Sequence, residues 1–180
     1  MLSLGFLLFI IFLALVVAEF QLLFFVLPVF LTRGGAPYVP SRKEDIAKMI
    51  SLAKIKPDDK AVDLGSGDGR IVIALARKGI EAHGYEISPA LVLWSRIKIY
   101  FLGLSGLAFI HSDSFWNADL SDFSLVTLFG FKKIMGDLET KLDKELKPNS
   151  RIISNMFKMP NWQISGEDNG VYEYVKISRL

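Results

Sequence analysis

The segment 61–70 constrains the fold more than any other part of this chain, and it reads A-V-D-L-G-S-G-D-G-R. A short apolar run ends on Asp63. Glycines then stand at Gly65, Gly67 and Gly69, directly before a helical pattern. Glycine adopts backbone angles that other residues avoid and lets a ligand approach the main chain. A strand, a glycine turn and a helix start together form a small-molecule site at the carboxyl edge of a parallel sheet. The segment therefore predicts an α/β fold with its binding site at this loop.

Glycine spacing and bulk composition exclude several classes of function. The order is G-x-G-x-G, and Arg70 stands where the G-x-G-x-x-G of dinucleotide binders has its last glycine, which disfavours a nucleotide-dependent oxidoreductase. The chain has no cysteine, which excludes disulfides and thiol catalysis, and its two histidines lie far apart, so no metal site is expected. A net charge of +2 gives no strong nucleic-acid footprint.

Residues 1–31 are almost entirely apolar, with Glu19 as their one charged side chain. A membrane-spanning helix needs about 20 mostly apolar residues. We therefore expect residues 1–31 to form a transmembrane anchor, with Pro28 kinking or ending the helix. A cleaved secretory signal is the alternative, because small residues at 16–18 resemble a cleavage site. No Lys or Arg precedes the apolar run, however, which favours the anchor.

Basic residues set the expected orientation of this anchor. Arg33 is the first of them, and Arg42 and Lys43 follow. By the positive-inside rule, we expect a single-pass membrane protein whose folded domain is cytoplasmic. Residues 32–40, T-R-G-G-A-P-Y-V-P, are a linker, and residues 41–180 form the folded domain.

Strand and helix signals alternate through this domain. Strands are expected at 61–64, 82–86, 107–111, 125–129 and 151–156, helices at 42–54, 70–78, 89–102 and 132–147, and a final hairpin from 162–165 and 171–177. Ser41 and Glu44 fit a capping box, and Ser88 with Pro89 fit the N-cap and first position of the third helix. The alternation favours a mostly parallel sheet with right-handed crossovers, to which the hairpin adds an antiparallel edge.

The D-x-G-x-G-x-G form of the loop resembles the first motif of the class I S-adenosylmethionine methyltransferases, which have a Rossmann-like sandwich. Acids follow in the same order, since Glu86 ends the second expected strand and Asp113 follows the third. The sequence L-K-P-N-S before the fifth strand also resembles a segment of that class. The resemblance covers residues 37–180 and implies S-adenosylmethionine as the cofactor.

The three parts of that cofactor suggest roles for the loop residues. The loop of Gly65, Ser66, Gly67 and Gly69 is expected to accept the amino-acid end and the adjacent sugar against bare backbone. Asp63 is placed to receive the ammonium group, directly or through water. The alternative for Asp63 is a strand-end residue that caps the next helix.

The two later acids are candidates for the remaining parts of the cofactor. Glu86 stands 21 residues after Gly65, where related nucleotide sites carry the ligand of the ribose diol; the alternative is a solvated loop acid. Asp113 fits an acceptor for the adenine amino group. Phe115 and Trp116 follow it, and either pack in the core or loop or sandwich the adenine ring.

Further segments resemble a narrower family, which includes the lysine methyltransferases of the ATP synthase c-subunit and the adenine nucleotide translocase. These segments are P-Y-V-P at 37–40, the loop at 62–72, G-Y-E at 84–86 and F-x-x-P-x-W at 157–162. The resemblance implies an apolar N-terminal segment, a membrane-protein substrate and methylation of a lysine side chain.

The fourth expected strand is not followed by the D/N-P-P-Y motif of amide- and base-directed N-methyltransferases; residues 128–131 read L-F-G-F. Lysine methylation needs no strong base, because alignment and desolvation provide most of the help, and no catalytic residue is assigned. Tyr38 is expected to line the lysine channel, with linker packing as its alternative, and Phe131 is expected to wall it. His83 and His111 are expected to be structural.

Together these features predict a membrane-anchored, S-adenosylmethionine-dependent methyltransferase that acts on a lysine of a membrane protein. Two alternatives stay open. In the first, the chain is a methyltransferase whose substrate is a small molecule or a lipid. In the second, it is a non-catalytic membrane protein that binds S-adenosylmethionine or a nucleotide.

Overall fold

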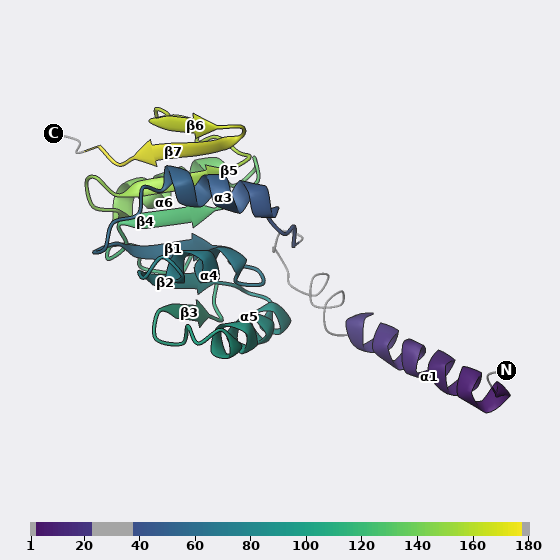
Figure 1. The fold of residues 1–180 in the computed structure, drawn as a ribbon. Coiled ribbons are helices and arrows are strands. Elements are labelled where there is room, and N and C mark those ends of the chain that lie inside the picture. The colour runs from purple at the N-terminus through teal and green to yellow at the C-terminus, as the bar shows by residue number, and fades with distance from the viewer. Residues whose placement is uncertain (1–2, 23–37, 178–180) are drawn as a thin grey trace.

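A computed structural model of the chain describes residues 3–22 and 38–177 (Figure 1). The helices are α1 (Leu4–Gln21), α3 (Lys43–Leu52), α4 (Arg70–Ala76), α5 (Pro89–Phe101) and α6 (Met135–Glu145), and the strands are β1 (Lys60–Leu64), β2 (Glu81–Tyr85), β3 (Ala108–His111), β4 (Leu125–Leu128), β5 (Arg151–Asn155), β6 (Gly166–Asp168) and β7 (Val171–Val175).

The seven strands form one sheet in the order β3-β2-β1-β4-β5-β7-β6. Strands β1 to β5 pair in parallel, and β7 is antiparallel to both β5 and β6. The predicted Rossmann-like sheet, mostly parallel with a C-terminal antiparallel hairpin, is therefore confirmed. Since the carboxyl ends of β1 to β5 share one edge, the loops that follow them meet there.

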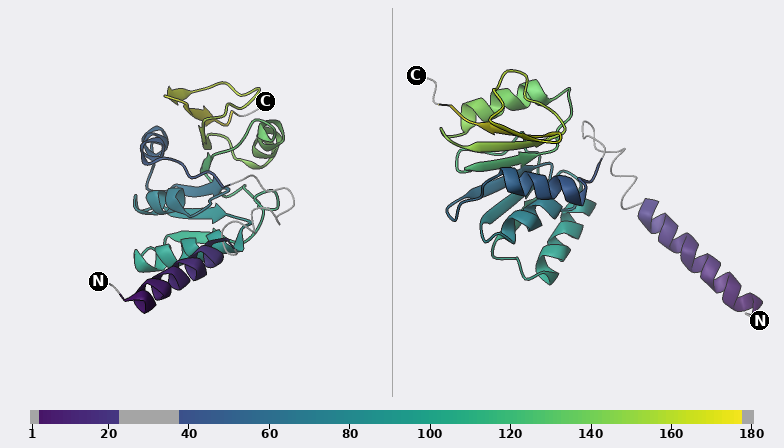
Figure 2. Two further views of the ribbon diagram at one scale, coloured as in Figure 1. Left: turned by 90° about the vertical axis from the view of Figure 1, so that its right-hand side faces the viewer. Right: turned by 45° about the horizontal axis from the view of Figure 1, so that its top comes forward.

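Helices cover both faces of this sheet (Figure 2). Successive residues of a strand point to opposite faces. Thus Ala61 packs in the core beneath α3, α4 and α5, whereas Val62 packs in the core beneath α6. The residues of β4 are all buried, as expected for a central strand covered on both sides.

Two histidines lie on the α6 side of β2 and β3. The Nδ1 of His83 lies 2.8 Å from the Nε2 of His111, and the Nε2 of His83 lies 2.7 Å from the Oε1 of Glu81. The rings of His83 and His111 stack, and burial lowers the pKa of His111. Both side chains are engaged with neighbouring strands, which agrees with the expected structural role.

The ends of two helices test the predicted caps. Ser88 is the N-cap of α5 and Pro89 its first residue, as predicted. The capping box at Ser41 is wrong, because α3 begins one residue later, with Arg42 as N-cap. Arg42 instead pairs with Asp45 (Nε–Oδ2 2.9 Å), while the Ser41 carbonyl accepts a hydrogen bond from Arg70 Nη1 (2.7 Å).

The C-terminal hairpin turns at Asn169 and Gly170, both with positive φ, as a two-residue hairpin requires. Its first strand is β6 at 166–168, so the prediction of a strand at 162–165 is wrong. The reason lies in Glu139 of α6, whose carboxylate accepts hydrogen bonds from the backbone N–H groups of Asn161 and Trp162. These contacts hold residues 161 and 162 against the helix, while Ser165, at the end of the predicted strand, donates from its N–H to the Glu173 carbonyl of β7 (2.8 Å).

Helix α1 is long and apolar enough to cross a membrane by length and composition. None of its described residues is buried against another part of the chain. The predicted anchor also includes residues 23–31 with Pro28, and these lie outside the described residues, as does most of the predicted linker. Residues 38–40 at the end of that linker form no helix or strand.

A buried ion pair joins α3 to the sheet. Arg151 of β5 donates from Nη1 to the carbonyls of Ala53 (2.5 Å) and Lys54 (2.6 Å), and its Nη2 pairs with Asp59. Asp59 also accepts from Ser124 Oγ and from a backbone N–H. Burial acts to raise the pKa of Asp59, but these hydrogen bonds outweigh it and lower that pKa.

Candidate functional site

The glycine loop leaves β1 at the carboxyl edge of the sheet and is held against β2. The backbone N–H groups of Gly65 and Ser66 both donate to the carbonyl of Tyr85, at 3.0 and 2.9 Å. Gly65, Gly67 and Gly69 all have positive φ, a region that favours glycine. At Gly65 no atom lies within 4 Å of the place where a Cβ would stand. The main chain is therefore open to a ligand at the strand end.

Glu86 meets this loop directly. The side chain is buried, and its Oε2 accepts a hydrogen bond from Gly67 N–H (2.9 Å) while its Oε1 accepts one from Ser88 N–H (2.7 Å). An ionised carboxylate has about four lone-pair positions, so capacity for a ligand hydroxyl remains. Glu86 is thus fixed between the loop and the start of α5, and the alternative of a solvated loop acid does not describe it.

The second loop residue, Ser66, lies very close to Gly84 of β2. A Cβ built on Gly84 would lie 2.6 Å from the Cβ of Ser66, so only a glycine at 84 lets the loop pass. Among the described residues, the Ser66 Oγ is a buried polar atom without a hydrogen-bond partner. Buried hydroxyls are rarely left unpaired.

Asp63 lies inside the sheet at this same edge. It is 2% exposed, and its Oδ1 accepts a hydrogen bond from Thr127 Oγ1 of β4 (2.8 Å). Burial raises the pKa of Asp63 to about 7, and the nearby charge of Glu86 adds to the rise, although the Thr127 bond acts to lower the pKa. The N-cap of α4 is Gly69, with no side-chain hydrogen bond, so Asp63 does not cap that helix.

Tyr38 lies over the loop, although 29 residues separate it from Gly67 in sequence. A Cβ built on Gly67 would lie 2.6 Å from Cε2 of the Tyr38 ring. The Tyr38 hydroxyl accepts a hydrogen bond from Arg70 Nη2 (3.3 Å). Burial and the Asp68 carboxylate raise the pKa of Tyr38, so the phenol keeps its proton at neutral pH. The segment before α3 therefore closes one side of the site.

The sequence did not indicate the ion-pair network that joins the glycine loop to helices α4 and α5. Asp68 pairs with Arg70 (Nε–Oδ1 2.8 Å) and with Lys98 of α5 (Nζ–Oδ2 2.8 Å). Burial acts to raise the pKa of Asp68, but these two cations outweigh it and lower the pKa to about 2. Asp68, an acid between two glycines of the loop, was the only signal in the sequence. Its partner Lys98 lies on α5, 30 positions later, so no local sequence pattern indicates the pair.

Two predicted residues are engaged with their own segments instead of the glycine loop. Asp113 follows β3, and its Oδ1 accepts hydrogen bonds from Ser114 N–H (2.6 Å) and from Asn117 Nδ2 (2.9 Å). Phe131 is half-buried in the turn that precedes α6, where its carbonyl accepts from Ile134 N–H. That turn is why α6 begins at Met135 and not at residue 132 as predicted. Both residues follow strand ends at the site edge, so their predicted roles stay predictions.

Of the two aromatic residues after Asp113, one packs in the core and the other is exposed to solvent. Phe115 packs against the α6-side core, whereas Trp116 is exposed, and their ring centroids are 4.8 Å apart.

The residues present fit a cofactor with a diol, a cation and a slender chain. Glu86 supplies a fixed acceptor, Asp63 a buried acid and Gly65 an open stretch of backbone, whereas the Ser66 hydroxyl is buried against Gly84. S-adenosylmethionine has this set of groups. The described residues contain no group of three or more metal-ligating side chains.

Comparison with known proteins decides the family. The profile of the ANTKMT methyltransferase domain matches residues 63–166, from the acid of the loop to the start of β6. This chain belongs to the ANTKMT methyltransferase domain family. The expected relation to the c-subunit and translocase lysine methyltransferases is therefore confirmed, as is the prediction of an S-adenosylmethionine-dependent methyltransferase domain.

Three relatives illustrate the range of this ANTKMT-type domain. The human ATP synthase c-subunit lysine N-methyltransferase is 38% identical over 134 residues, which are 73% of this chain and 57% of the human protein. A protein-lysine N-methyltransferase of Saccharolobus islandicus is 36% identical over 149 residues, 77% of this chain and 92% of the relative. A solved RNA methyltransferase of Salinibacter ruber with bound S-adenosylhomocysteine is 32% identical, with a TM-score of 0.75 over 79% of this chain and 96% of that chain.

The chain spans only about half the length of the vertebrate c-subunit enzymes, between 51% and 58%. By contrast, it spans nearly all of the archaeal lysine methyltransferase. The shared part of the ANTKMT-type domain contains the glycine loop, Glu86, Asp113 and the strands that carry them.

Proposed function

We propose that this chain is a membrane-anchored, S-adenosylmethionine-dependent protein-lysine N-methyltransferase that modifies a membrane protein. The observation that carries the proposal is the direct bond between Glu86 and the glycine loop, beside open backbone at Gly65. The names of the human and archaeal relatives support lysine as the target.

Each cofactor group then has a residue to hold it. Glu86 accepts the ribose hydroxyls, since its carboxylate is already oriented by Gly67 and Ser88. The backbone of Gly65 and Ser66 faces the amino-acid end, and Asp63 attracts its ammonium group, directly or through water. Asp113 accepts from the adenine amino group. When bound, S-adenosylmethionine supplies a methyl group that its sulfonium makes electrophilic.

The chain's part in the transfer is positioning. The lysine nitrogen must be a free amine, whose lone pair forms the new N–C bond as the S–C bond breaks; the displaced proton passes to solvent. Tyr38 and Phe131 line the approach and exclude water from it. Because the Tyr38 phenol keeps its proton, it orients the amine and does not act as a base.

The setting at the membrane rests on α1 and on the basic residues that follow it. Inserted as a single span, α1 places the folded domain on the cytoplasmic side, because Arg33, Arg42 and Lys43 lie on that flank. A tether of this kind raises the local concentration of a substrate in the same membrane.

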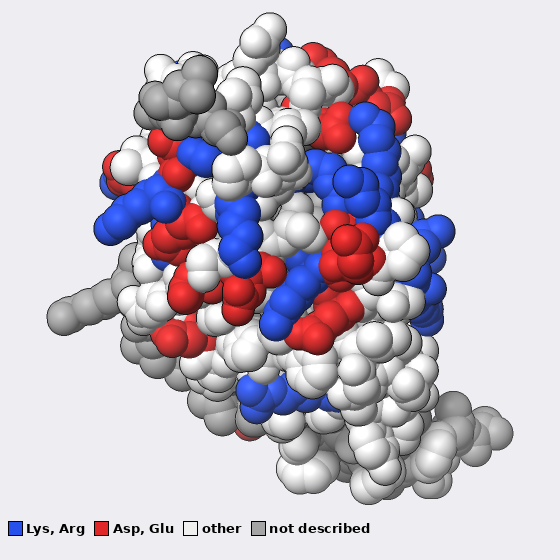
Figure 3. Space-filling view, turned by 90° about the vertical axis from the view of Figure 1, so that its left-hand side faces the viewer, with Lys and Arg blue, Asp and Glu red and all other residues white. Residues whose placement is uncertain are grey.

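A second substrate class is named by the solved relative, which is an RNA methyltransferase. The net charge of the chain is only +2, and Figure 3 shows acidic and basic side chains interspersed over the face where the parallel strands begin, opposite the glycine loop. Uniform positive charge is the usual footprint of RNA binding. Protein therefore remains the substrate that we propose, and RNA, a small molecule or lipid become outcomes of the test.

The test is methyl transfer in membranes from a strain that lacks this chain. Purified full-length protein is added with S-adenosylmethionine labelled in its methyl group, and the product is divided among protein, RNA and lipid fractions. We expect label in protein, at a lysine that peptide mass spectrometry locates. Label confined to RNA or lipid would refute the lysine assignment, and binding of the cofactor without any transfer would identify a non-catalytic protein. Glu86→Ala should lose the transfer, whereas Asp122→Ala, at an exposed acid, should keep it.

A further inference from the structure

Helix α5 is apolar on its outer side as well as on its inner side, with Arg96 and Lys98 as its charged side chains. Its inner side contributes Val92 and Ile99 to the core, as expected for a helix on a sheet. Its outer side exposes five large apolar residues to solvent: Leu93, Trp94, Ile97, Tyr100 and Phe101. We call these five the outer face of α5. An ordinary surface helix has charged and polar residues on the side opposite the core, so an apolar outer side is unusual in solvent.

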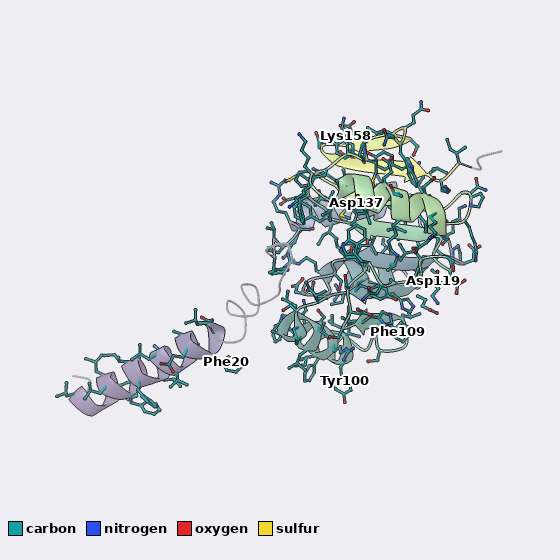
Figure 4. All side chains as sticks on the ribbon, turned by 180° about the vertical axis from the view of Figure 1, so that it is seen from behind. Phe20, Tyr100, Phe109, Asp119, Asp137 and Lys158 are labelled. Atoms are coloured by element: carbon teal, nitrogen blue, oxygen red, sulfur yellow. The ribbon has the colours of Figure 1, made fainter. Side chains whose placement is uncertain are left out.

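The outer face is unusually open at its C-terminal end. Tyr100 is 73% exposed and Phe101 is 81% exposed. Figure 4 shows Tyr100 projecting from α5, at the same end of the domain as Phe109 of β3, which is also exposed. Contiguous apolar surface of this kind marks a site of interaction with a membrane or another protein.

The charge pattern around the outer face is one-sided. From Ile87 to Ile110 the chain contains no acidic residue, and Arg96 and Lys98 are its only charged side chains. A helix with Trp, Phe and Leu on one face and basic residues beside them is typical of segments that lie in the headgroup region of a bilayer. Trp and Tyr prefer that region, because they combine an apolar ring with a polar tip.

We propose that the outer face of α5 docks on the surface of an anionic bilayer, as a second membrane contact besides α1. The apolar side chains enter the boundary between headgroups and acyl chains. Arg96, whose guanidinium also donates to the Ile110 carbonyl, faces lipid phosphates, whereas Lys98 stays paired with Asp68. This inference rests on the membrane setting of the proposed function but not on methyl transfer.

Docking in this way would set the position of the site. Helix α5 begins at Pro89, three residues after Glu86, at the edge of the sheet where the glycine loop lies. Lys98 of α5 also pairs with Asp68 of that loop. A docked α5 therefore holds the cofactor edge close to the headgroups, within reach of a lysine at the surface of a membrane protein.

The absence of native cysteine allows the proposal to be tested in the full-length chain. Single cysteines are introduced by Tyr100→Cys on α5, Asp137→Cys on α6 and Phe12→Cys in α1, and each carries a fluorescent label. The proteins are reconstituted in vesicles of phosphatidylcholine and phosphatidylglycerol. Quenching is measured with nitroxide-bearing lipids and, separately, with iodide. Asp137 is the matched control, because Figure 4 places it on the helix that covers the other face of the sheet.

We expect lipid nitroxides to quench the labels at positions 12 and 100 but not the label at position 137. Iodide should quench only the label at 137. A label at 100 that is as open to iodide as the label at 137 would overturn the docking. So would protection from iodide without lipid quenching, which would mean a second copy of the chain or residues 23–31 as the occupant. Quenching at 12 reports the anchor alone, so failure of the anchor is distinguished from failure of α5.

A second pair of variants checks the outer face without altering the labelled residue. Ile97→Glu places an acid in the outer face and should abolish lipid quenching at position 100, while S-adenosylmethionine affinity is retained. Thr140→Glu, on the exposed side of α6, should change neither. Vesicles of phosphatidylcholine alone should give weaker quenching at 100, because Arg96 then lacks anionic lipid beside it. Full quenching in the Ile97→Glu variant would contradict the proposal.

Discussion

Two buried acids at the two ends of β1 differ in how the protein treats their charge. Asp59, just before the strand, is bonded to Arg151, to Ser124 and to a backbone N–H, and its pKa is lowered. Asp63, inside the strand, is still more deeply buried, but it is bonded to the neutral Thr127 hydroxyl, and its pKa is raised to about 7. Only four positions separate the two acids in sequence.

The difference supports the proposal that Asp59 is a structural acid whereas Asp63 binds the cofactor. A buried carboxylate is expensive unless it is paired, and a fold that needs one only for stability surrounds it with donors. Asp59 meets that description. Asp63 pairs with no cation in the described part of the chain and lies beside Glu86 and the open backbone of Gly65, where a ligand ammonium group would supply the missing charge. Substitution and pH titration can test each side of this contrast.

The largest expected effect is the loss of the cation beside Asp59. Arg151→Met leaves Asp59 buried and unpaired and also removes the donor to the carbonyls of Ala53 and Lys54. Breaking a buried ion pair in this way costs about 3–5 kcal/mol of unfolding free energy. Urea denaturation measures the loss. Arg77→Met, at an exposed arginine just after α4, is the control and should change stability little. A small loss for Arg151→Met would remove the contrast between the two acids.

The second effect is a pH dependence of opposite sign for the two acids. A raised pKa means that folded Asp63 keeps its proton after the unfolded chain has lost it. Its contribution to stability is therefore full below about pH 4 and is lost as pH rises to about 7, a few kcal/mol in all. Asp59, with a lowered pKa, contributes above about pH 4 and loses this as pH falls through its folded value.

The measurement is unfolding free energy against pH for the parent chain and for Asp63→Asn. The variant should lack the decline between about pH 4 and 7, since asparagine does not titrate. Identical pH profiles for the two proteins would show that Asp63 is not the source of the decline, and Asp63 would then no longer contrast with Asp59.

The third effect concerns cofactor binding. Glu86→Ala should weaken S-adenosylmethionine binding by at least about tenfold, or about 1.4 kcal/mol, because the oriented acceptor for the diol is lost. Isothermal calorimetry on the full-length protein gives the affinity. Asp122→Ala serves as the matched control at an exposed acid. Unchanged affinity would show that Glu86 does not hold the ribose hydroxyls.

The smallest effect is expected at the rim. Tyr38→Phe removes only the 3.3 Å bond from Arg70, while the ring stays over Gly67. We expect about 0.5–1 kcal/mol or less in stability and no change in cofactor affinity. Tyr38→Ala, which removes the ring, should raise KM for the lysine substrate in the methyl-transfer assay. If KM is unchanged in Tyr38→Ala, Tyr38 is linker packing and does not line the channel.

Sequence was informative where the deciding contacts are local. The loop follows β1 directly, Glu86 follows β2, and Ser88 with Pro89 starts α5, so each was predictable from neighbouring residues. Contacts between distant segments leave no such pattern. The pairs Arg151–Asp59 and Lys98–Asp68 each join residues of different elements, and only the packed fold brings them together.

The errors have the same origin. Glu139 of α6 captures residues 161 and 162, which shifts the hairpin strand to β6, and Arg70 draws on the Ser41 carbonyl at the start of α3. In both places a side chain from a distant segment forms hydrogen bonds with the backbone, and these override the secondary structure that the local sequence favours. Tyr38 illustrates the limit most clearly, because the sequence suggested its chemistry but not that it would cover Gly67.

Arg151 also has a consequence for the order of events during synthesis. The carbonyls of Ala53 and Lys54, at the end of α3, receive their donor from a residue made 98 and 97 positions later. At about 5–20 residues per second, the ribosome needs on the order of ten seconds to reach it. Until then, α3 has no fifth strand to pack against, and Asp59 has no guanidinium. The half of the sheet that holds the glycine loop can form first, and α3 is fixed to the sheet only after β5 has been made.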